Sequence, residues 1–301
     1  MVERPRSRGY LATAVREVVS TPHGLLGAII VGLLLFVAAF APWIAPWPYD
    51  QQDLPAVVAN GGPLPPLSPG HLLGTDFLGR DVLSRVIDGA RVSMTVAFIA
   101  QLAVLAIGVP IGLAAGWRGG WLDTSLMRFA DIIYVIPDLL FVIMITAAVV
   151  ETPLFGMLNG LLVVFIGIGL VTWVGMARLV RAQVLVLRES GYVEAAQAMG
   201  VPSKQIVSRH VLPNSTGSIV IAVSLGIPIA ILVESTLSFL GLGVQIPRGS
   251  WGSLIDAGID NVTRAPWMLP PPLVALGVAL LGFTLLGDGL RDAFDPKTRE
   301  R

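Results

Sequence analysis

The sequence has no cysteine, few charged residues and only three histidines, and each shortage excludes a kind of chemistry. The absence of cysteine excludes disulfides, thiolate metal sites, iron–sulfur clusters and thiol nucleophiles. His23, His71 and His210 lie tens of residues apart, so no paired-histidine pattern predicts a metal site. The 20 basic and 20 acidic residues give a net charge of zero, which disfavours nucleic-acid binding.

Catalytic motifs are also missing. A nucleotide-binding P-loop ends in GK followed by serine or threonine, and neither Lys204 nor Lys297 stands in that pattern. The sequence contains no GxSxG nucleophile elbow and no GxGxxG fingerprint. We therefore predict no catalytic residue, no metal site and no cofactor-binding site in this chain.

Long apolar runs are what the sequence does have. Hydrophobic residues make up 54% of the chain and charged residues 13%, against roughly 25% charged in soluble proteins. A bilayer core about 30 Å thick needs about 20 helical residues to cross it. Runs of this kind predict an all-α membrane protein with six transmembrane helices at residues 24–44, 92–117, 129–150, 157–177, 217–242 and 267–287. The first run is too long for a cleaved signal and is expected to stay as an anchor.

The distribution of basic residues predicts the orientation of the chain. With both termini in the cytoplasm, 15 of the 20 lysine and arginine residues lie in inner segments and 5 in outer ones. Short cytoplasmic loops are enriched in these residues. We also expect a cytoplasmic N-terminal segment (1–23), a first helix with its outer loop (24–91), a five-helix core (92–287) and a cytoplasmic tail (288–301).

The outer segment before the second span changes character along its length. Residues 45–70 are rich in proline and glycine and predict irregular or polyproline II chain. Residues 80–91 place apolar residues at helical spacing, with Asp81 four residues before Arg85. Two interpretations stay open for this part, an interfacial amphipathic helix and a helical extension of the span.

The inner segment 178–216 is too polar to span the membrane. Alanine-rich helix formers end at Gly200, which suits the left-handed conformation just past a helix end. Pro202 fits the first turn of a second helix, and Pro213 is expected to close that helix. Two short helices joined at a glycine and connected to spans on both sides would form a lever.

The same segment carries a family resemblance. "EAAQAMG", nine residues and then "HVLP" resembles the EAA motif of ABC-importer permeases, Glu-Ala-Ala-x3-Gly-x9-Ile-x-Leu-Pro, with His210 in place of isoleucine. A histidine at this position resembles the sequences of the peptide branch of this family. "HLLGTDFLGRDVLSRVIDGARVS", "GWRGGWLDTSLMRFADIIYVIP", "ESTLSFLGLGVQIPRGSWG" and "LLGDGLRDAFDPK" are similar to dipeptide, oligopeptide and nickel permeases of the second-subunit type, that of dipeptide permease C.

The resemblance implies a type I ABC importer permease in a bacterial inner membrane. It implies a second, homologous permease, two cytoplasmic ATPases that bind and hydrolyse ATP, and an extracytoplasmic binding protein that delivers peptides or similar small solutes. It assigns the docking of the ATPases to the EAA-type segment, with Glu194, Ala195, Ala196, Gly200, Leu212 and Pro213.

Two carboxylates inside predicted spans are candidates for the translocation path. Asp138 lies about nine residues, or roughly 14 Å, into the third span, where an ionisable group faces a cavity or a partner. Glu234 lies near the outer mouth, at a gate or a binding-protein contact, or in a structural hydrogen bond with Ser235, Ser238 or a neighbouring subunit. Asp131 is expected to pair with Arg128 one turn earlier.

Prolines and glycines within the spans are open to two interpretations. Pro110, Pro137, Gly226 and Pro228 act either as hinges or as sites of close packing. Pro270 and the two prolines after it predict a kink or a late helix start.

Two other functions compete with an importer permease. An ion-coupled secondary carrier would show internal repeats with midplane charges in both halves, whereas only Asp138 lies near the midplane. A membrane scaffold without transport activity is the third possibility.

Overall fold

The computed structural model describes residues 16–149, 152, 161–244 and 247–294, and within these ranges the chain is helical. The long helices are α2 (Pro22–Ile44), α4 (Val82–Arg118), α8 (Leu161–Arg188), α11 (Leu212–Phe239) and α13 (Pro270–Phe294). The shorter elements are α3 (Leu54–Asn60), α5 (Gly120–Val135), α6 (Asp138–Val149), α9 (Gly191–Ala198), α10 (Ser203–Ile206), η2 (Val207–Val211), α12 (Trp251–Asp260) and η3 (Pro266–Met268). No extended strand occurs in the described ranges.

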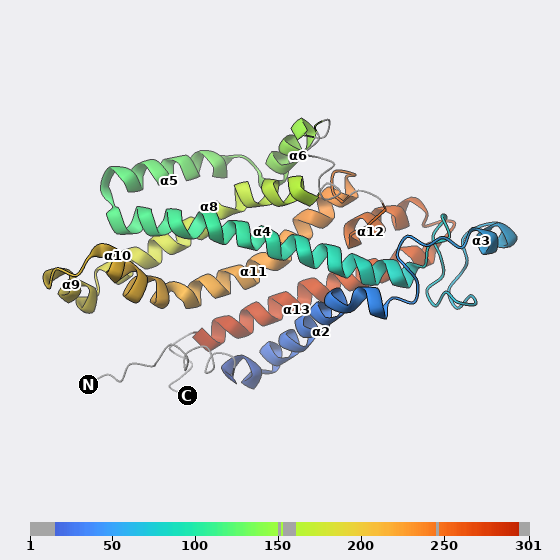
Figure 1. Ribbon diagram of the computed structural model, residues 1–301, viewed down its shortest axis with the longest axis horizontal. Coiled ribbons are helices and arrows are strands. Elements are labelled where there is room, and N and C mark those ends of the chain that lie inside the picture. Colours follow the sequence, from blue (N-terminus) through green and yellow to red (C-terminus); the bar gives the residue numbers. More distant parts are fainter. Residues whose placement is uncertain (1–15, 150–151, 153–160, 245–246, 295–301) are drawn as a thin grey trace.

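The helices form an elongated bundle (Figure 1). Five helical stretches are long and apolar enough to cross a membrane, and the bent pair α5–α6 would make a sixth span. This confirms the predicted all-helical membrane architecture. α9 and α10 lie at one end of the long axis and α3 at the other. The start of α2 and the end of α13 point toward the end that carries α9.

The third predicted span is not one straight helix. α5 begins at Gly120, nine residues before the predicted start, and the chain bends by 83° between Val135 and Asp138. Pro137 stands at this break, where it has no N–H to continue the helix and disfavours helical geometry at Ile136. Pro110 and Pro228, by contrast, lie inside continuous helices. Only Pro137 of these prolines therefore interrupts a described span.

The helical extension of the second span is correct. α4 runs without a break from Val82 through the whole apolar run to Arg118. Asp81, four residues before Arg85, caps the helix by accepting the N–H of Ser84 at 2.7 Å. Arg85 instead donates to Asp76 at 2.7 Å.

The outer segment is more ordered than its composition predicts. It contains α3, in which the side chain of Asp53 accepts the N–H of Ala56 at 3.2 Å and Gly61 ends the helix at φ 71°. An N-terminal cap and a left-handed glycine define even a short helix. The expectation of purely irregular chain was wrong because these two local signals lie within the proline-rich stretch.

The late start of the last span is confirmed. A short 3-10 turn, η3, precedes α13, which begins at Pro270. Proline is tolerated in the first turn of a helix because the N–H groups there lack helical partners.

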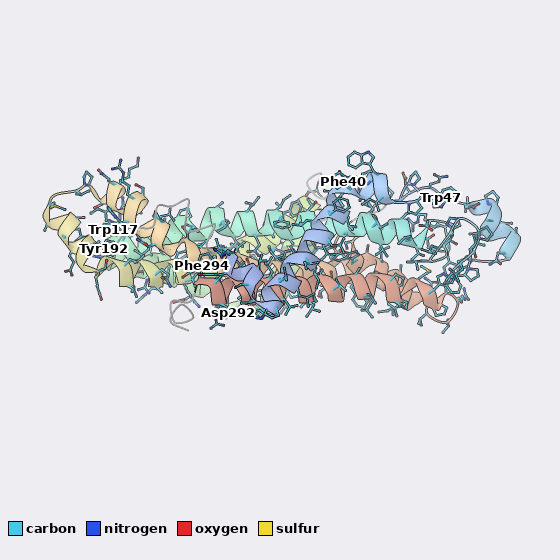
Figure 2. All side chains as sticks on the ribbon, turned by 90° about the horizontal axis from the view of Figure 1, so that it is seen from below. Phe40, Trp47, Trp117, Tyr192, Asp292 and Phe294 are labelled. Atoms are coloured by element: carbon cyan, nitrogen blue, oxygen red, sulfur yellow. The ribbon has the colours of Figure 1, made fainter. Side chains whose placement is uncertain are left out.

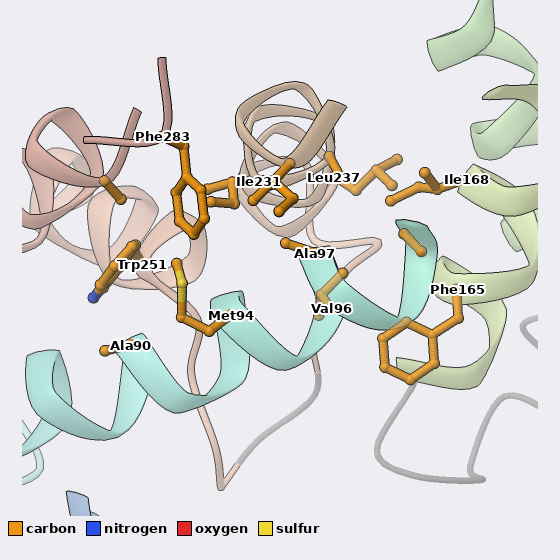
Figure 3. Packing of buried hydrophobic residues seen from close by; sticks show 14 of the residues in the cluster. Ala90, Met94, Val96, Ala97, Phe165, Ile168, Ile231, Leu237, Trp251 and Phe283 are labelled. Carbon is orange, nitrogen blue, oxygen red and sulfur yellow. The ribbon is translucent and has the colours of Figure 1, made fainter. Parts of the chain in front are cut away.

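The core lies where α4, α8, α11, α12 and α13 meet (Figure 3). Val96 and Ala97 of α4 face Ile231 and Leu237 of α11, and Trp251 of α12 belongs to the same buried cluster. The Trp251 ring N–H donates to the carbonyl of Val86 at 3.0 Å, so its one polar group is satisfied. Apolar contact therefore holds these helices together.

Three glycines bring α4 and α8 into close contact. A Cβ added at Gly108, Gly112 or Gly116 would lie 2.5 to 2.8 Å from atoms of α8, including the Ala177 carbonyl and the Val180 side chain. The spacing of four residues puts the three glycines on one face. Small residues at this spacing allow transmembrane helices to approach closely. This stripe fixes α8, and hence the segment that follows it.

Candidate coupling segment and carboxylate sites

α9 has one buried face and one exposed face. Val193 is 0% exposed and Ala196 6%, whereas Glu194, Ala195 and Met199 are exposed. The buried side chains pack with Val180 and Val184 of α8 and with Ile206. Glu194 and Ala195 are therefore free to meet another protein while their neighbours fix the helix.

Gly200 has the predicted left-handed conformation, at φ 74°. The N–H of Gly200 donates to Gln197 at 2.9 Å, and that of Val201 donates to Ala196 at 3.1 Å. These are the two hydrogen bonds of a Schellman cap. A Cβ at Gly200 would meet nothing within 4 Å, so the backbone conformation alone selects glycine there.

Pro213 does not close the second helix, contrary to expectation. The chain continues from α10 through the π-helical turn η2 into α11, and Leu212 is helical at φ −61° and ψ −46°. A π turn widens the backbone ring and accommodates the ring of the proline. The Asn214 side chain donates to the carbonyl of His210 at 2.5 Å, and Ser215 to that of Val211 at 2.9 Å. The inner segment is thus joined to α11 without a break.

The sequence-predicted coupling residues divide into four groups. Glu194 and Ala195 are exposed on α9, and Gly200 forms the bend. Ala196 and Leu212 pack into one inner apolar cluster with Val211 and Ile219. Pro213 is exposed at the start of α11. Tyr192 and Trp117 mark the same end of the bundle in Figure 2.

Asp138 and Asp131 lie on either side of the break in the third span. Asp138 is the first residue of α6 and is exposed on this chain. A carboxylate in the first turn of a helix is stabilised by the helix dipole. Asp131 pairs with Arg178 of α8 at 2.5 Å, so the predicted pair with Arg128 is wrong. The partner lies on a different helix, which spacing along one helix does not reveal.

Glu234 is enclosed within the chain. It is 0% exposed, and its carboxylate accepts hydrogen bonds from Ser238 at 2.7 Å and from Ser93 of α4 at 3.3 Å. The structural hydrogen bond to Ser238 was one of the two predicted alternatives. Contact of Glu234 with the path or a gate stays a prediction.

Sequence reasoning missed a buried polar network in the outer segment. His71 is 2% exposed; its Nδ1 lies 3.0 Å from Asp81, and its ring stacks on Trp47 at 5.2 Å. Asp76 accepts from Arg80 and Arg85 at 2.7 Å each. Arg80 lies four residues after Asp76, and this spacing was the available signal; Arg85 lies nine residues after Asp76. No group of three metal-binding side chains occurs in the described ranges.

Comparison with solved structures defines the class. The chain is similar to the MetNI methionine ABC transporter in inward-facing conformations, at a TM-score of 0.53 in two crystal forms. The two matches have 22% and 18% identity and cover 70% of this chain and 96% or 97% of the other. The fold is that of a type I ABC importer permease.

Sequence comparison gives the family. Residues 108–300 match the family described as "Binding-protein-dependent transport system inner membrane component", and residues 9–66 match the "N-terminal TM domain of oligopeptide transport permease C". The chain belongs to the family of binding-protein-dependent inner-membrane permeases.

Its relatives include the oligopeptide transport system permease protein OppC of Bacillus subtilis (strain 168), 39% identical over 93% of this chain and 88% of the relative. OppC of Escherichia coli (strain K12) is 40% identical over 97% of this chain and 93% of the relative. The dipeptide transport system permease protein DppC of Bacillus subtilis (strain 168) is 38% identical over 99% of this chain and 89% of the relative.

Family membership settles the general function. The chain is a permease subunit of an ABC importer in the bacterial inner membrane, and ATP hydrolysis belongs to partner ATPases. In general terms it also implies a partner permease and a substrate-binding protein. Neither a secondary carrier nor a scaffold without transport activity agrees with this family.

Proposed function

We propose that this chain is one of two homologous permease subunits of a peptide importer, driven by two ATPases that dock on α9. The substrate class rests on the relatives, whose names describe transport of oligopeptides, dipeptides and, for a protein of Pectobacterium atrosepticum 35% identical to this chain, glutathione. A separate binding protein outside the membrane delivers the substrate.

The observation that carries the docking proposal is the division of α9 into two faces. Glu194 and Ala195 are exposed, while Val193 and Ala196 on either side of them are buried against α8 and α10. A partner that contacts the exposed face therefore presses on a helix that cannot move alone. Its displacement is passed to α8 through Val180 and Val184.

The second connection runs from α9 to α11. Gly200 joins α9 to α10, and η2 continues α10 into α11 as one helical stretch from residue 203 to residue 239. Rotation of α9 therefore acts on two spans at once. This is the mechanical link that we propose between ATPase closure and opening of the path.

Charge reversal on the exposed face tests the docking proposal. Glu194→Lys leaves the buried contacts of α9 unchanged, so we expect normal membrane insertion together with loss of ATPase attachment or of its stimulation. Glu189→Lys is the matched control, an equally exposed charge reversal in the same inner segment. For each variant, pull-down of the ATPases measures attachment, and substrate-stimulated ATP hydrolysis in vesicles measures stimulation. Normal attachment and stimulation in Glu194→Lys would refute docking on this face.

For the path, we propose that Asp138 faces the translocation route. It is exposed on this chain and stands at the bend of α5–α6, where the span changes direction. The contrasting alternative is a pair with a neighbouring subunit. Glu234 would first have to leave Ser93 and Ser238 to reach the path.

A further inference from the structure

α5 lies between two breaks in the helical chain. At its start Gly119 and Gly120 have φ of 63° and 60°, and a Cβ at Gly120 would meet nothing within 4 Å. At its end the chain bends by 83° before α6 begins at Asp138. Element-terminal residues of this kind absorb the backbone changes of a hinge. Contacts with α4 and α8, beside which α5 lies in Figure 1, must therefore fix its direction.

Apolar packing alone holds α5 weakly. Of its 16 residues only Ala130 is buried, and Ile133 beside it is half-buried. Trp121 and Val135, near its two ends, are 82% and 80% exposed. The burial of one methyl side chain contributes little to the position of a helix. Polar contacts are therefore needed to hold α5 in place.

Arg181 of α8 holds α5 through Asp123. Its Nε donates to Asp123 Oδ1 at 2.5 Å, and its Nη2 donates to Oδ2 at 2.7 Å. Two parallel hydrogen bonds between planar groups fix orientation as well as distance. The side chains of Arg181 and Asp123 are 34% and 15% exposed, against 40% and 62% for Arg178 and Asp131, which form a second pair between these helices. The less exposed pair is the stronger connection, because solvent screens it less.

Arg181 lies in the part of α8 that contacts α9. Val180 and Val184, one residue before it and three residues after it, pack in the same cluster as Val193 and Ala196 of α9. Adjacent residues of a helix point in different directions, so Arg181 contacts α5 while its neighbours contact α9. A displacement of α8 by α9 therefore moves Arg181 directly.

We propose that the Asp123–Arg181 pair makes α5 follow α8, so that displacement of α9 reaches Asp138 at the far end of α5. This inference rests on the proposed docking of the ATPases on α9. At 1.5 Å per residue α5 is about 24 Å long, so a rotation near Asp123 gives a larger movement at the bend. Asp123 and Arg181 are positioning residues that act through α5 on Asp138.

Exchange of the two charges tests the proposal. Arg181→Asp and Asp123→Arg each place like charges opposite one another, and the double variant restores an opposite pair. In the reconstituted importer we expect substrate uptake to fall about tenfold or more in each single variant, because hydrogen bonds between charged groups are lost. The double variant should recover most of the uptake, and Asp131→Asn, in the more exposed pair, should transport normally. Normal uptake in both single variants, or no recovery in the double variant, would overturn the proposal.

Pull-down of the ATPases separates this proposal from docking on α9. Attachment and basal ATP hydrolysis should stay normal in the charge-exchange variants, because the pair acts after docking. Normal attachment in Glu194→Lys would refute docking on α9, whereas normal uptake in Arg181→Asp would refute only the role of the pair. Loss of attachment in Arg181→Asp would place its effect at docking and contradict the proposal.

Spin labels measure directly whether α5 follows α8, which a merely stabilising pair does not require. Val135→Cys on α5 and Val186→Cys on α8, 80% and 71% exposed, are labelled in this cysteine-free chain within a complex whose other subunits lack reactive cysteines. We expect one narrow distribution of label distances with and without ATP, and a broadened distribution with ATP in Arg181→Gln. Arg181→Gln also replaces Arg181→Asp in the uptake assay if the latter fails to assemble. A distance that changes with ATP in the unaltered pair, or a narrow distribution in Arg181→Gln, would contradict the proposal.

Discussion

Single residues set the geometry of the coupling segment and of the third span. Gly200 bends the inner segment because its backbone is at φ 74°, and Asp138 begins α6 because Pro137 has just ended the preceding helix. The first was predictable from one glycine after an alanine-rich helix. The start of α6 at Asp138 was not predictable, because the effect of Pro137 could not be known from the sequence. A proline can equally lie inside a continuous helix, as Pro110 and Pro228 do.

Gly200→Val should uncouple transport from ATP hydrolysis. Valine strains a left-handed backbone by about 1–3 kcal/mol, and the turn relieves this strain by changing the angle between α9 and α10. Gly200→Asn is the matched control, because asparagine tolerates this conformation. Substrate-stimulated ATP hydrolysis in vesicles should be lost with valine and retained with asparagine. Equal activity of the two variants would show that the bend is unimportant.

Asp138→Asn should impair transport while the complex still assembles. The change keeps the volume of the side chain and removes its charge, so a path role affects uptake and leaves basal ATP hydrolysis near normal. Asp131→Asn is the comparison, since it alters the same bent pair at an exposed ion pair with Arg178, where we expect little effect. Loss of assembly in Asp138→Asn would instead favour pairing with another subunit.

At the scale of elements, helix existence was easier to predict than helix contacts. Apolar length alone located the spans, because a run of about 20 apolar residues has few alternatives to a membrane helix. The joint between α10 and α11 was mispredicted, because a π turn accommodates Pro213 and sequence patterns do not announce such turns. The Asp131–Arg178 and Arg85–Asp76 pairs likewise depend on which elements pack together.

The close contact of α4 with α8 gives the element-scale prediction. Gly112→Ala should destabilise the protein by about 1–3 kcal/mol, because the new Cβ would lie 2.5 Å from the Ala177 carbonyl. Gly32→Ala in α2 is the control, since its Cβ would meet nothing within 4 Å and alanine favours the helix. The temperature of thermal unfolding in detergent should fall for Gly112→Ala and not for Gly32→Ala. A similar shift in both would refute close packing at Gly112.

At the scale of the whole molecule, the two ends of the bundle have different roles. One end carries α9 and α10, and the other carries α3 (Figure 1). The distribution of basic residues predicts that the α9 end is cytoplasmic. Every described span then alternates in direction, which agrees with the order of the elements along the chain.

Single cysteines in this cysteine-free chain test the orientation. An impermeant maleimide added to intact cells should label Val58→Cys, which is 77% exposed beside the outer loop. It should not label Ser203→Cys until the membrane is opened, because α10 is predicted to be cytoplasmic. Labelling of Ser203→Cys in sealed cells would reverse the topology.

The most direct test of the central claim is photo-cross-linking from the exposed face of α9 in the assembled importer. A photoreactive amino acid at Ala195 should form a covalent adduct with an ATPase subunit, identified by its peptides in mass spectrometry. The same group at Val58, at the opposite end of the bundle, should not. An adduct from Val58, or none from Ala195 in a complex that hydrolyses ATP, would contradict the account.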